Sequence, residues 1–144
     1  METGHIGLNV TDLARSRAFY QRVLGLEQVG QGEQPSRYAF LSRDGRLVLT
    51  LWEQSEGTFP TDQPGLHHLS FQVASMNEVR TAEATLRELG AELTHEGPVA
   101  HGEGASSGGI FFTDPDGIRL EIYALDGAQA LAAPAGTAPT CGFF

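Results

Sequence analysis

The stretches HIGLNV (His5–Val10) and HLSFQV (His68–Val73) are two versions of one short pattern, separated by 68 − 5 = 63 residues. In each stretch, apolar residues alternate with small or polar ones, which is the pattern of a half-buried strand. A histidine heads the polar face of both predicted strands, His5 in the first copy and His68 in the second. Its neighbour His67 falls on the opposite face. The chain is therefore predicted to contain an internal repeat in which His5 and His68 are equivalent.

The repeat extends well beyond these two strands. A helix is predicted after each strand, and both helices should end at a Leu-Gly pair, Leu24-Gly25 and Leu89-Gly90. Segments 38–52 and 110–123 then align around an Asp-Gly turn, with an offset of 117 − 45 = 72 that sets Leu49 against Glu121. Each half reads as strand, helix and three strands. We expect an α+β fold in which two paired βαβββ modules form a curved mixed sheet around a cleft, with the helices outside.

Length and charge limit the possible functions. The 144 residues suit a single domain, residues 1–125, made of modules at about 3–55 and 66–125. A formal net charge of −9, without a basic stripe, argues against nucleic acid and against an anionic membrane surface as partners. No apolar run is long enough to span a membrane and no signal peptide is evident, so a cytoplasmic location is expected.

The last part of the chain has a different composition. Residues 126–144 form a tail rich in Ala, Gly and Pro, which we expect to be mobile over most of its length. The closing CGFF (Cys141–Phe144) is apolar, so we expect it to dock near the cleft or on a partner subunit.

Three residues of the two modules are candidate metal ligands. His5, His68 and Glu121 occupy matching strand positions, and they would converge if the halves close around a cleft. Two imidazoles and one carboxylate suit Fe²⁺ or Mn²⁺, with Zn²⁺, Ni²⁺ or Co²⁺ possible. The alternative is structural: a single histidine at a strand start is usually hydrogen-bonded or at the surface, and Glu121 could simply pair with Arg119.

The sequence resembles the vicinal oxygen chelate superfamily, which includes glyoxalase I, bleomycin-resistance proteins, extradiol dioxygenases and fosfomycin-resistance enzymes. The resemblance is carried by GHIGLNVTDLARSRAFYQRVLGLE from Gly4, HLSFQV from His68 and FFTDPDGIRLEIY from Phe111. It implies the paired βαβββ fold, a divalent metal held by His5, His68 and Glu121, and a homodimer that acts on a small molecule.

Departures from the family patterns separate the subfamilies. Glyoxalase I has a fourth ligand, Glu or Gln, in the first hairpin, where the matching residue here is Leu49. Extradiol dioxygenases and fosfomycin-resistance enzymes use three ligands, and the latter also need cations, for which Arg119 and Arg37 are candidates. Bleomycin-type binders keep the fold without a metal.

The resemblance to extradiol dioxygenases implies further site residues. His101 corresponds to a signature histidine that could serve as a catalytic acid or base. Phe111 replaces the signature tyrosine, and Tyr38 or Tyr123 could supply the missing hydroxyl. The loop 101–109 reads either as a flexible hairpin loop or as a cover over the substrate. The predicted catalytic residues are His101 and Tyr123, and the predicted substrate-binding residues are Tyr38, Leu49, Phe111 and Arg119.

The leading hypothesis is a metal-dependent enzyme that performs dioxygenase-type chemistry on a small oxygen-rich molecule. One alternative is thiol transfer or epoxide opening, as in fosfomycin resistance, or a glyoxalase-like lyase reaction. The other is a non-catalytic protein that binds a small molecule.

Overall fold

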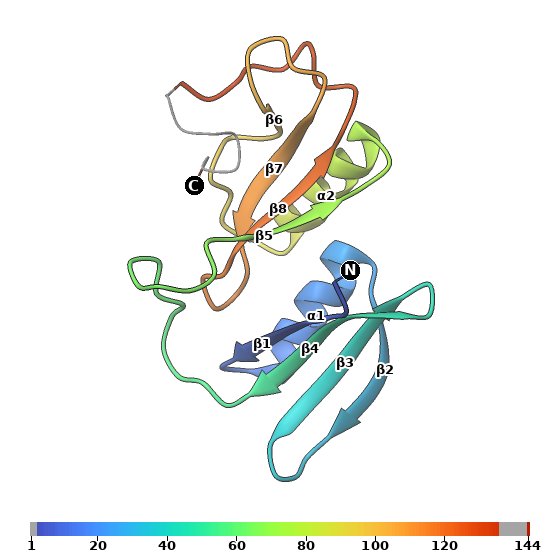
Figure 1. Cartoon of the computed structure of the whole chain (residues 1–144), viewed down its shortest axis with the longest axis vertical. Helices are drawn as coiled ribbons and strands as arrows, with labels where there is room; N and C mark the ends of the chain where they lie inside the picture. Colours follow the sequence, from blue (N-terminus) through green and yellow to red (C-terminus); the bar gives the residue numbers. More distant parts are fainter. Residues whose placement is uncertain (1–2, 136–143) are drawn as a thin grey trace. The chain divides into compact units, whose positions relative to one another are not determined.

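The computed structural model describes residues 3–135 and residue 144. The chain forms two compact units, residues 1–59 and residues 60–144, and each has the same succession of elements (Figure 1). The boundary between the units falls in the segment expected to join the two modules.

The first unit is a βαβββ module with a four-stranded sheet. Its elements are β1 (Ile6–Val10), α1 (Leu13–Leu24), β2 (Glu27–Gly32), β3 (Arg37–Arg43) and β4 (Arg46–Glu53). The strand order is β1-β4-β3-β2, in which β1 runs parallel to β4 and the other neighbours are antiparallel.

The second unit repeats this plan. Its elements are β5 (Leu69–Gln72), α2 (Met76–Glu88), β6 (Val99–Ala100), β7 (Gly108–Thr113) and β8 (Arg119–Ala124). The strand order is β5-β8-β7-β6, with β5 parallel to β8. The predicted α+β class and the two mixed βαβββ modules are confirmed, although their strands form two separate four-stranded sheets. Pairing of the modules around one cleft stays a prediction.

The helices end where the sequence predicts, and each begins after a capping side chain. The side chain of Asp12 caps α1 by accepting a hydrogen bond from the Arg15 amide at 2.9 Å, and Ser75 caps α2 in the same way. Gly25, with φ at 64°, ends α1 in the left-handed conformation that favours glycine. The buried positions of α2 recur every three or four residues, as expected for one face of a helix packed on a sheet: Met76, Val79, Ala82 and Leu86.

The two faces of the second sheet differ in chemistry. Ile110 pairs with Ile122 and Phe112 with Leu120, and all four apolar side chains are buried. Helix α2 contacts β7 and β8. Because side chains alternate across a strand, the residues between these positions share the opposite face. That face carries polar and aromatic side chains: Ser70, Gln72, Phe111, Arg119, Glu121 and Tyr123.

Strand pairing corrects the predicted alignment of the two modules. Ser70 pairs with Glu121 on the parallel strands of the second unit, and its equivalent Gly7 pairs with Thr50 in the first. Thr50, rather than Leu49, therefore matches Glu121, and the offset in these strands is 121 − 50 = 71. The difference arises at an irregularity between β3 and β4 that adds one residue to β4, which an alignment on the Asp-Gly turns cannot detect.

The expectation of a mobile tail is wrong for its first part. Ala128 is fully buried, and its amide donates to the Ser106 carbonyl at 2.8 Å. The Ala132 carbonyl accepts from the Ala100 amide at 3.1 Å. The small side chain of Ala128 fits here because Gly108, which it packs against, has no Cβ. Cys141 and Phe143 lie outside the described residues.

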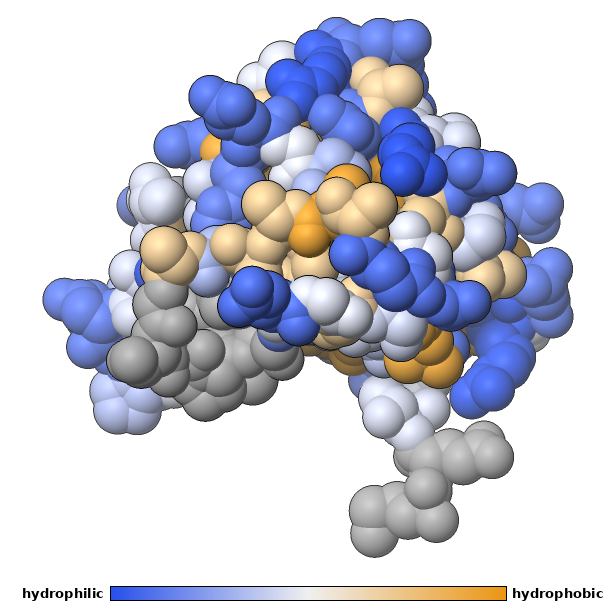
Figure 2. All heavy atoms as spheres, turned by 90° about the horizontal axis from the view of Figure 1, so that it is seen from above, coloured by the Kyte–Doolittle hydropathy of each residue, from blue (hydrophilic) through white to orange (hydrophobic). Residues whose placement is uncertain are grey.

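Much of the visible surface is hydrophilic. Figure 2 shows a face dominated by hydrophilic residues, with hydrophobic ones in small groups. The large hydrophobic residues that are exposed within the described part of the chain are Val29, Leu66 and Leu125. Neither helix within residues 3–135 is long and apolar enough to cross a membrane.

Candidate functional site

Glu121 lies at the centre of a polar cluster on the second sheet. Its side chain is buried, with 4% of the residue's surface exposed. Ser70 Oγ donates a hydrogen bond to Oε2 at 2.5 Å, and His101 Nε2 lies 2.8 Å from Oε1. His68 Nε2 is 4.0 Å from Oε2. A buried carboxylate is costly unless it is hydrogen-bonded, and these neighbours provide that stabilisation.

The strands and one loop bring these groups together. Ser70 stands beside Glu121 because β5 and β8 pair in parallel, and His68 precedes Ser70 by two residues, so the two share a face. His101 arrives from the loop after β6. Its Nδ1 is 3.1 Å from Ser107 Oγ, and its amide donates to the Ser107 carbonyl at 3.0 Å. The loop predicted as either a flexible connection or a substrate cover thus holds His101 against Glu121.

The environment of His68 favours its neutral form. Burial lowers the pKa of His68 below the ordinary value, and the nearby His67 and Arg119 lower it further, while Glu121 opposes them. Neutral imidazole is the form that binds a metal ion. His67 is exposed, and its Nδ1 lies 2.8 Å from His68 Nδ1, so it supports His68 from the side away from Glu121.

Aromatic side chains surround the polar cluster. The Tyr123 ring centroid lies 5.7 Å from that of His101, and the Tyr123 hydroxyl donates to Gln72 Oε1 at 3.1 Å. Phe111 is fully buried and lies 6.2 Å from the His101 ring. The predicted residues His68, His101, Phe111, Arg119, Glu121 and Tyr123 therefore occupy one region of the second unit.

The remaining predicted residues belong to the first unit. His5 is exposed and directly precedes β1, so its convergence with His68 and Glu121 stays a prediction. Tyr38 packs against Phe40 and Trp52 at centroid distances of 5.0 and 5.1 Å. Leu49 is fully buried, and alternation along β4 places it on the opposite face from Thr50.

The corrected alignment of the modules still places no fourth metal ligand of the glyoxalase I type in the first hairpin. Thr50 is the residue that matches Glu121, and it carries neither a carboxylate nor an amide. Its hydroxyl accepts a hydrogen bond from Trp52 Nε1 at 3.2 Å.

Arg37, one of the two candidate cations for an anionic substrate, already has partners. Its Nη1 lies 2.7 Å from Glu53 Oε1, and its Nε lies 3.3 Å from Glu33. Glu53 also accepts a hydrogen bond from the Leu13 amide at 2.7 Å, which ties β4 to the start of α1. We therefore assign Arg37 and Glu53 to the support of the first unit.

Ser70 and Ser107 were not predicted from the sequence. Ser70 carried a usable signal, because it lies two residues after His68 on a strand whose polar face was already selected. Ser107 had none, since the path of the loop that returns it to His101 is not encoded in a periodic pattern.

The donor chemistry fits a divalent metal, although the ligands are not assembled around a point in either unit. Within residues 3–135 and 144, no group of three His, Cys, Asp or Glu side chains is arranged to hold a metal ion. His68 and Glu121 nevertheless place an imidazole and a carboxylate side by side, which is the mixed donor set of open metal sites in enzymes.

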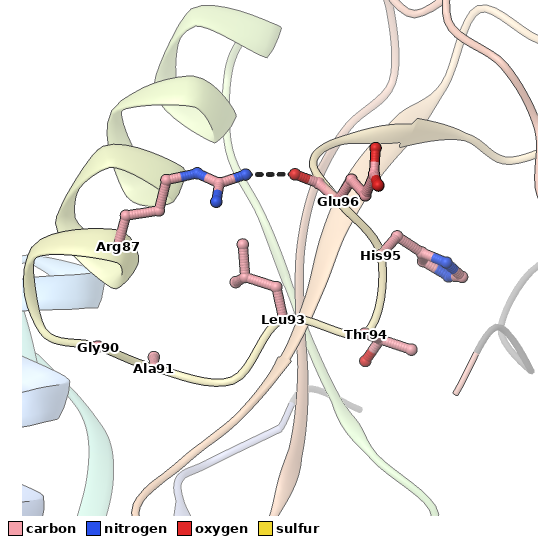
Figure 3. A pocket seen from close by; sticks show the side chains of 7 residues that line it. All are labelled: Arg87, Gly90, Ala91, Leu93, Thr94, His95 and Glu96. Carbon is pink, nitrogen blue, oxygen red and sulfur yellow. Dashed lines mark hydrogen bonds between the residues drawn. The ribbon is translucent and has the colours of Figure 1, made fainter.

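A pocket lies beyond the end of α2, away from the Glu121 cluster in sequence (Figure 3). The Arg87 guanidinium spans it and donates to the Glu96 carbonyl. Arg87 also pairs with Glu83 of the same helix at 2.8 Å. Its guanidinium group therefore links α2 to the loop that follows. The other residues that line this pocket are Gly90, Ala91, Leu93, Thr94 and His95.

Comparison with known proteins places this geometry in a family. The model of the Glyoxalase/Bleomycin resistance protein/Dioxygenase superfamily matches residues 3–122. The chain belongs to this superfamily. The predicted resemblance to vicinal oxygen chelate proteins is thereby confirmed.

One relative of known activity is a dioxygenase. Catechol-2,3-dioxygenase of Bacillus subtilis is 31% identical over 129 residues, which cover 85% of this chain and 42% of that protein. The chain thus spans less than half the length of this relative.

Solved structures of the superfamily show the same fold. A glyoxylase/bleomycin resistance protein/dioxygenase domain from Frankia sp. EAN1pec has a TM-score of 0.74 and 26% identity, over 86% of this chain and 97% of that one. A mutant of the fosfomycin resistance protein FosX from Listeria monocytogenes, complexed with Mn(II) and 1S,2S-dihydroxypropylphosphonic acid, has a TM-score of 0.67 and 27% identity, over 85% of this chain and 91% of that one. The relatives therefore include both a dioxygenase and a fosfomycin resistance protein.

Proposed function

We propose that the chain is a metal-dependent enzyme that opens the ring of a small aromatic vicinal diol with dioxygen. The observation that supports this most is the buried Glu121, held by Ser70 and His101 and facing His68. The similarity to catechol-2,3-dioxygenase supports the choice of reaction.

The proposed metal ligands are His5, His68 and Glu121. Fe²⁺ or Mn²⁺ is favoured for this donor set, and Zn²⁺, Ni²⁺ and Co²⁺ are also compatible with it. The bound metal would act as a Lewis acid that holds two neighbouring substrate oxygens. We also propose a homodimer, because the edge strands of each small sheet need to be covered.

The other residues of the second unit are assigned to orientation and proton transfer. His101, fixed by Ser107, is the proposed acid or base that exchanges a proton with a substrate hydroxyl. Tyr123, fixed by Gln72, supplies a hydroxyl for positioning the substrate. Phe111 forms an apolar wall and Arg119 supplies positive charge, while Tyr38 is the proposed aromatic contact from the first unit.

A second candidate reaction is thiol transfer or epoxide opening on a phosphonate-like molecule. It is supported by the similarity to FosX and by Arg119, which shares the sheet face of Glu121. A glyoxalase-like lyase reaction is a weaker alternative, because Thr50 stands where a fourth carboxylate or amide ligand would be needed. The remaining alternative is non-catalytic binding of a small molecule.

Metal analysis and substrate screening together test the proposal. Protein purified without chelators should contain about one divalent metal per chain. His68→Ala should lose it, whereas the matched variant His67→Ala should retain it. The Fe²⁺- and Mn²⁺-loaded proteins are then offered catechols, the epoxide fosfomycin with a thiol, and 2-oxoaldehydes.

Ring opening should consume one dioxygen per catechol and should be absent from His68→Ala. Turnover of fosfomycin or of a 2-oxoaldehyde alone would replace the first choice with the corresponding alternative. Absence of bound metal and of turnover in all three assays would favour non-catalytic binding.

A further inference from the structure

The last residue of the chain lies against the candidate site. The Phe144 ring centroid is 5.3 Å from that of His68 and 5.2 Å from that of Phe111. The Arg119 guanidinium carbon lies 5.6 Å from the centre of the same ring. His67 makes a fourth, more distant contact at 6.2 Å. The expectation that the apolar terminus docks near the site is met by this residue.

These contacts are of the kinds that select for a planar aromatic ring. The Phe111 ring meets Phe144 edge to face, with an interplanar angle of 81°, and the His68 ring is tilted by 40°. Both arrangements are favourable for aromatic pairs, and a guanidinium over a ring face adds a cation–π attraction. The ring alone makes all of these contacts, so a free aromatic molecule could make them equally well.

The Phe144 ring occupies a position beside the polar cluster where a ligand could bind. His68 touches the Phe144 ring and lies 4.0 Å from Glu121, so the ring occupies space next to these two proposed metal ligands of the second unit. Arg119 supplies a positive charge beside that space. A small aromatic carboxylate matches both features, since its ring replaces the phenyl group and its anion can pair with the guanidinium.

We propose that His68, Phe111 and Arg119 form a binding subsite for a small aromatic carboxylate, and that Phe144 is a built-in competitor for it. A ligand must displace the terminal ring before it can bind. The apparent dissociation constant is then raised by the reciprocal of the fraction of molecules in which the subsite is open. If Phe144 is docked in roughly nine molecules of ten, its removal tightens binding about tenfold, which corresponds to about 1.4 kcal/mol.

The test measures phenylacetate binding to the full-length, metal-free protein by titration calorimetry. Phe144→Ala should bind phenylacetate about tenfold more tightly than the unmodified chain, and Phe144→Leu should fall between them. Val29→Ala, which truncates an exposed apolar side chain of the first unit, should leave the dissociation constant unchanged. Cyclohexylacetate, which lacks the aromatic ring, should bind more weakly than phenylacetate to Phe144→Ala.

Nuclear magnetic resonance provides the second measurement. Phenylacetate should shift the His68 ring signals of Phe144→Ala toward their positions in the unmodified protein, because it restores an aromatic ring beside them. Equal or weaker binding by Phe144→Ala, or no binding to either protein, would overturn the inference.

The metal-free design keeps this outcome separate from that of the proposed function. The subsite deepens the proposed function by naming a class of ligand. It rests on the proposed function only in that the subsite would lie beside the bound metal. Tighter binding by Phe144→Ala without turnover in any metal-loaded assay would refute the reaction and leave the subsite standing. Ring-opening activity with unchanged phenylacetate affinity would refute the subsite and leave the reaction standing.

Discussion

Asp114 is predicted to be the residue that fixes the position of β8, and with it Glu121. It lies in the turn between β7 and β8 with 4% of its surface exposed. Its Oδ1 accepts hydrogen bonds from the amides of Asp116 at 2.9 Å and Ile118 at 2.8 Å. Its own amide donates to the Ile118 carbonyl at 2.9 Å, which closes the turn one residue before β8 begins.

The substitution Asp114→Ala removes the shared acceptor and leaves two buried amides without it. A hydrogen bond to a charged group contributes about 1.5–3 kcal/mol, so the pair together predicts a loss of roughly 3–6 kcal/mol in the free energy of unfolding. At about 2.1 cal/mol/K of unfolding entropy per residue, the 144 residues give roughly 0.3 kcal/mol per degree. Asp114→Ala should therefore lower the melting temperature by about 10–20 °C.

Thermal unfolding followed by circular dichroism measures this change. Asp114→Asn keeps an oxygen in place and loses only the charge, so it should cost about 1 kcal/mol, or roughly 3 °C. Asp44→Asn, at the exposed turn of the first unit, should be nearly neutral because asparagine tolerates the positive φ of 51° found there. A melting temperature of Asp114→Ala equal to that of Asp114→Asn would refute the assignment.

Two further predictions concern the second sheet. Ser70→Ala should weaken divalent metal binding about tenfold, because the Glu121 carboxylate loses the hydrogen bond that orients it. Gln72→Ala, on the same face, should have little effect on metal affinity, and equal affinities of the two variants in a competition titration would contradict the prediction. Gly108→Ala should destabilise the fold by roughly 2–3 kcal/mol, because the added Cβ would stand 2.5 Å from a neighbouring backbone carbonyl. Gly102→Ala, with its nearest neighbour at 3.9 Å, is the matched control, and equal denaturation midpoints would show that the close contact relaxes freely.

The elements of the fold could be predicted because they depend on local patterns. Alternating apolar residues in HIGLNV and HLSFQV specify half-buried strands, and the spacing of apolar residues in α2 specifies one buried face. The alignment of the two modules could not be read with the same accuracy. One additional residue in β4 shifts Thr50 into the place expected for Leu49, and such an irregularity depends on the pairing of two strands.

The candidate site was predictable to a similar extent. His68 could be found because it repeats the place of His5 before a regular strand, and Glu121 because alternation places it on one face of its strand with Arg119 and Tyr123. Ser70 follows from the same alternation. The contact of His101 with Glu121 depends on a loop that is closed by Ser107, and no periodic pattern encodes such a path. The partial ordering of the tail was missed for a related reason. Composition indicates mobility, but the buried Ala128 is held by its fit against Gly108 and by a backbone hydrogen bond.

Comparison of the two modules indicates why the polar cluster lies in the second. The strand pairing that places Ser70 beside Glu121 places Gly7 beside Thr50 in the first module. Glycine has no side chain to orient a neighbour, and the Thr50 hydroxyl is already bonded to Trp52. The same backbone therefore presents a hydrogen-bonded carboxylate in one copy and an aromatic surface of Tyr38, Phe40 and Trp52 in the other. Divergence at a few facing positions is sufficient to give one module a buried, hydrogen-bonded carboxylate and the other a cluster of aromatic side chains.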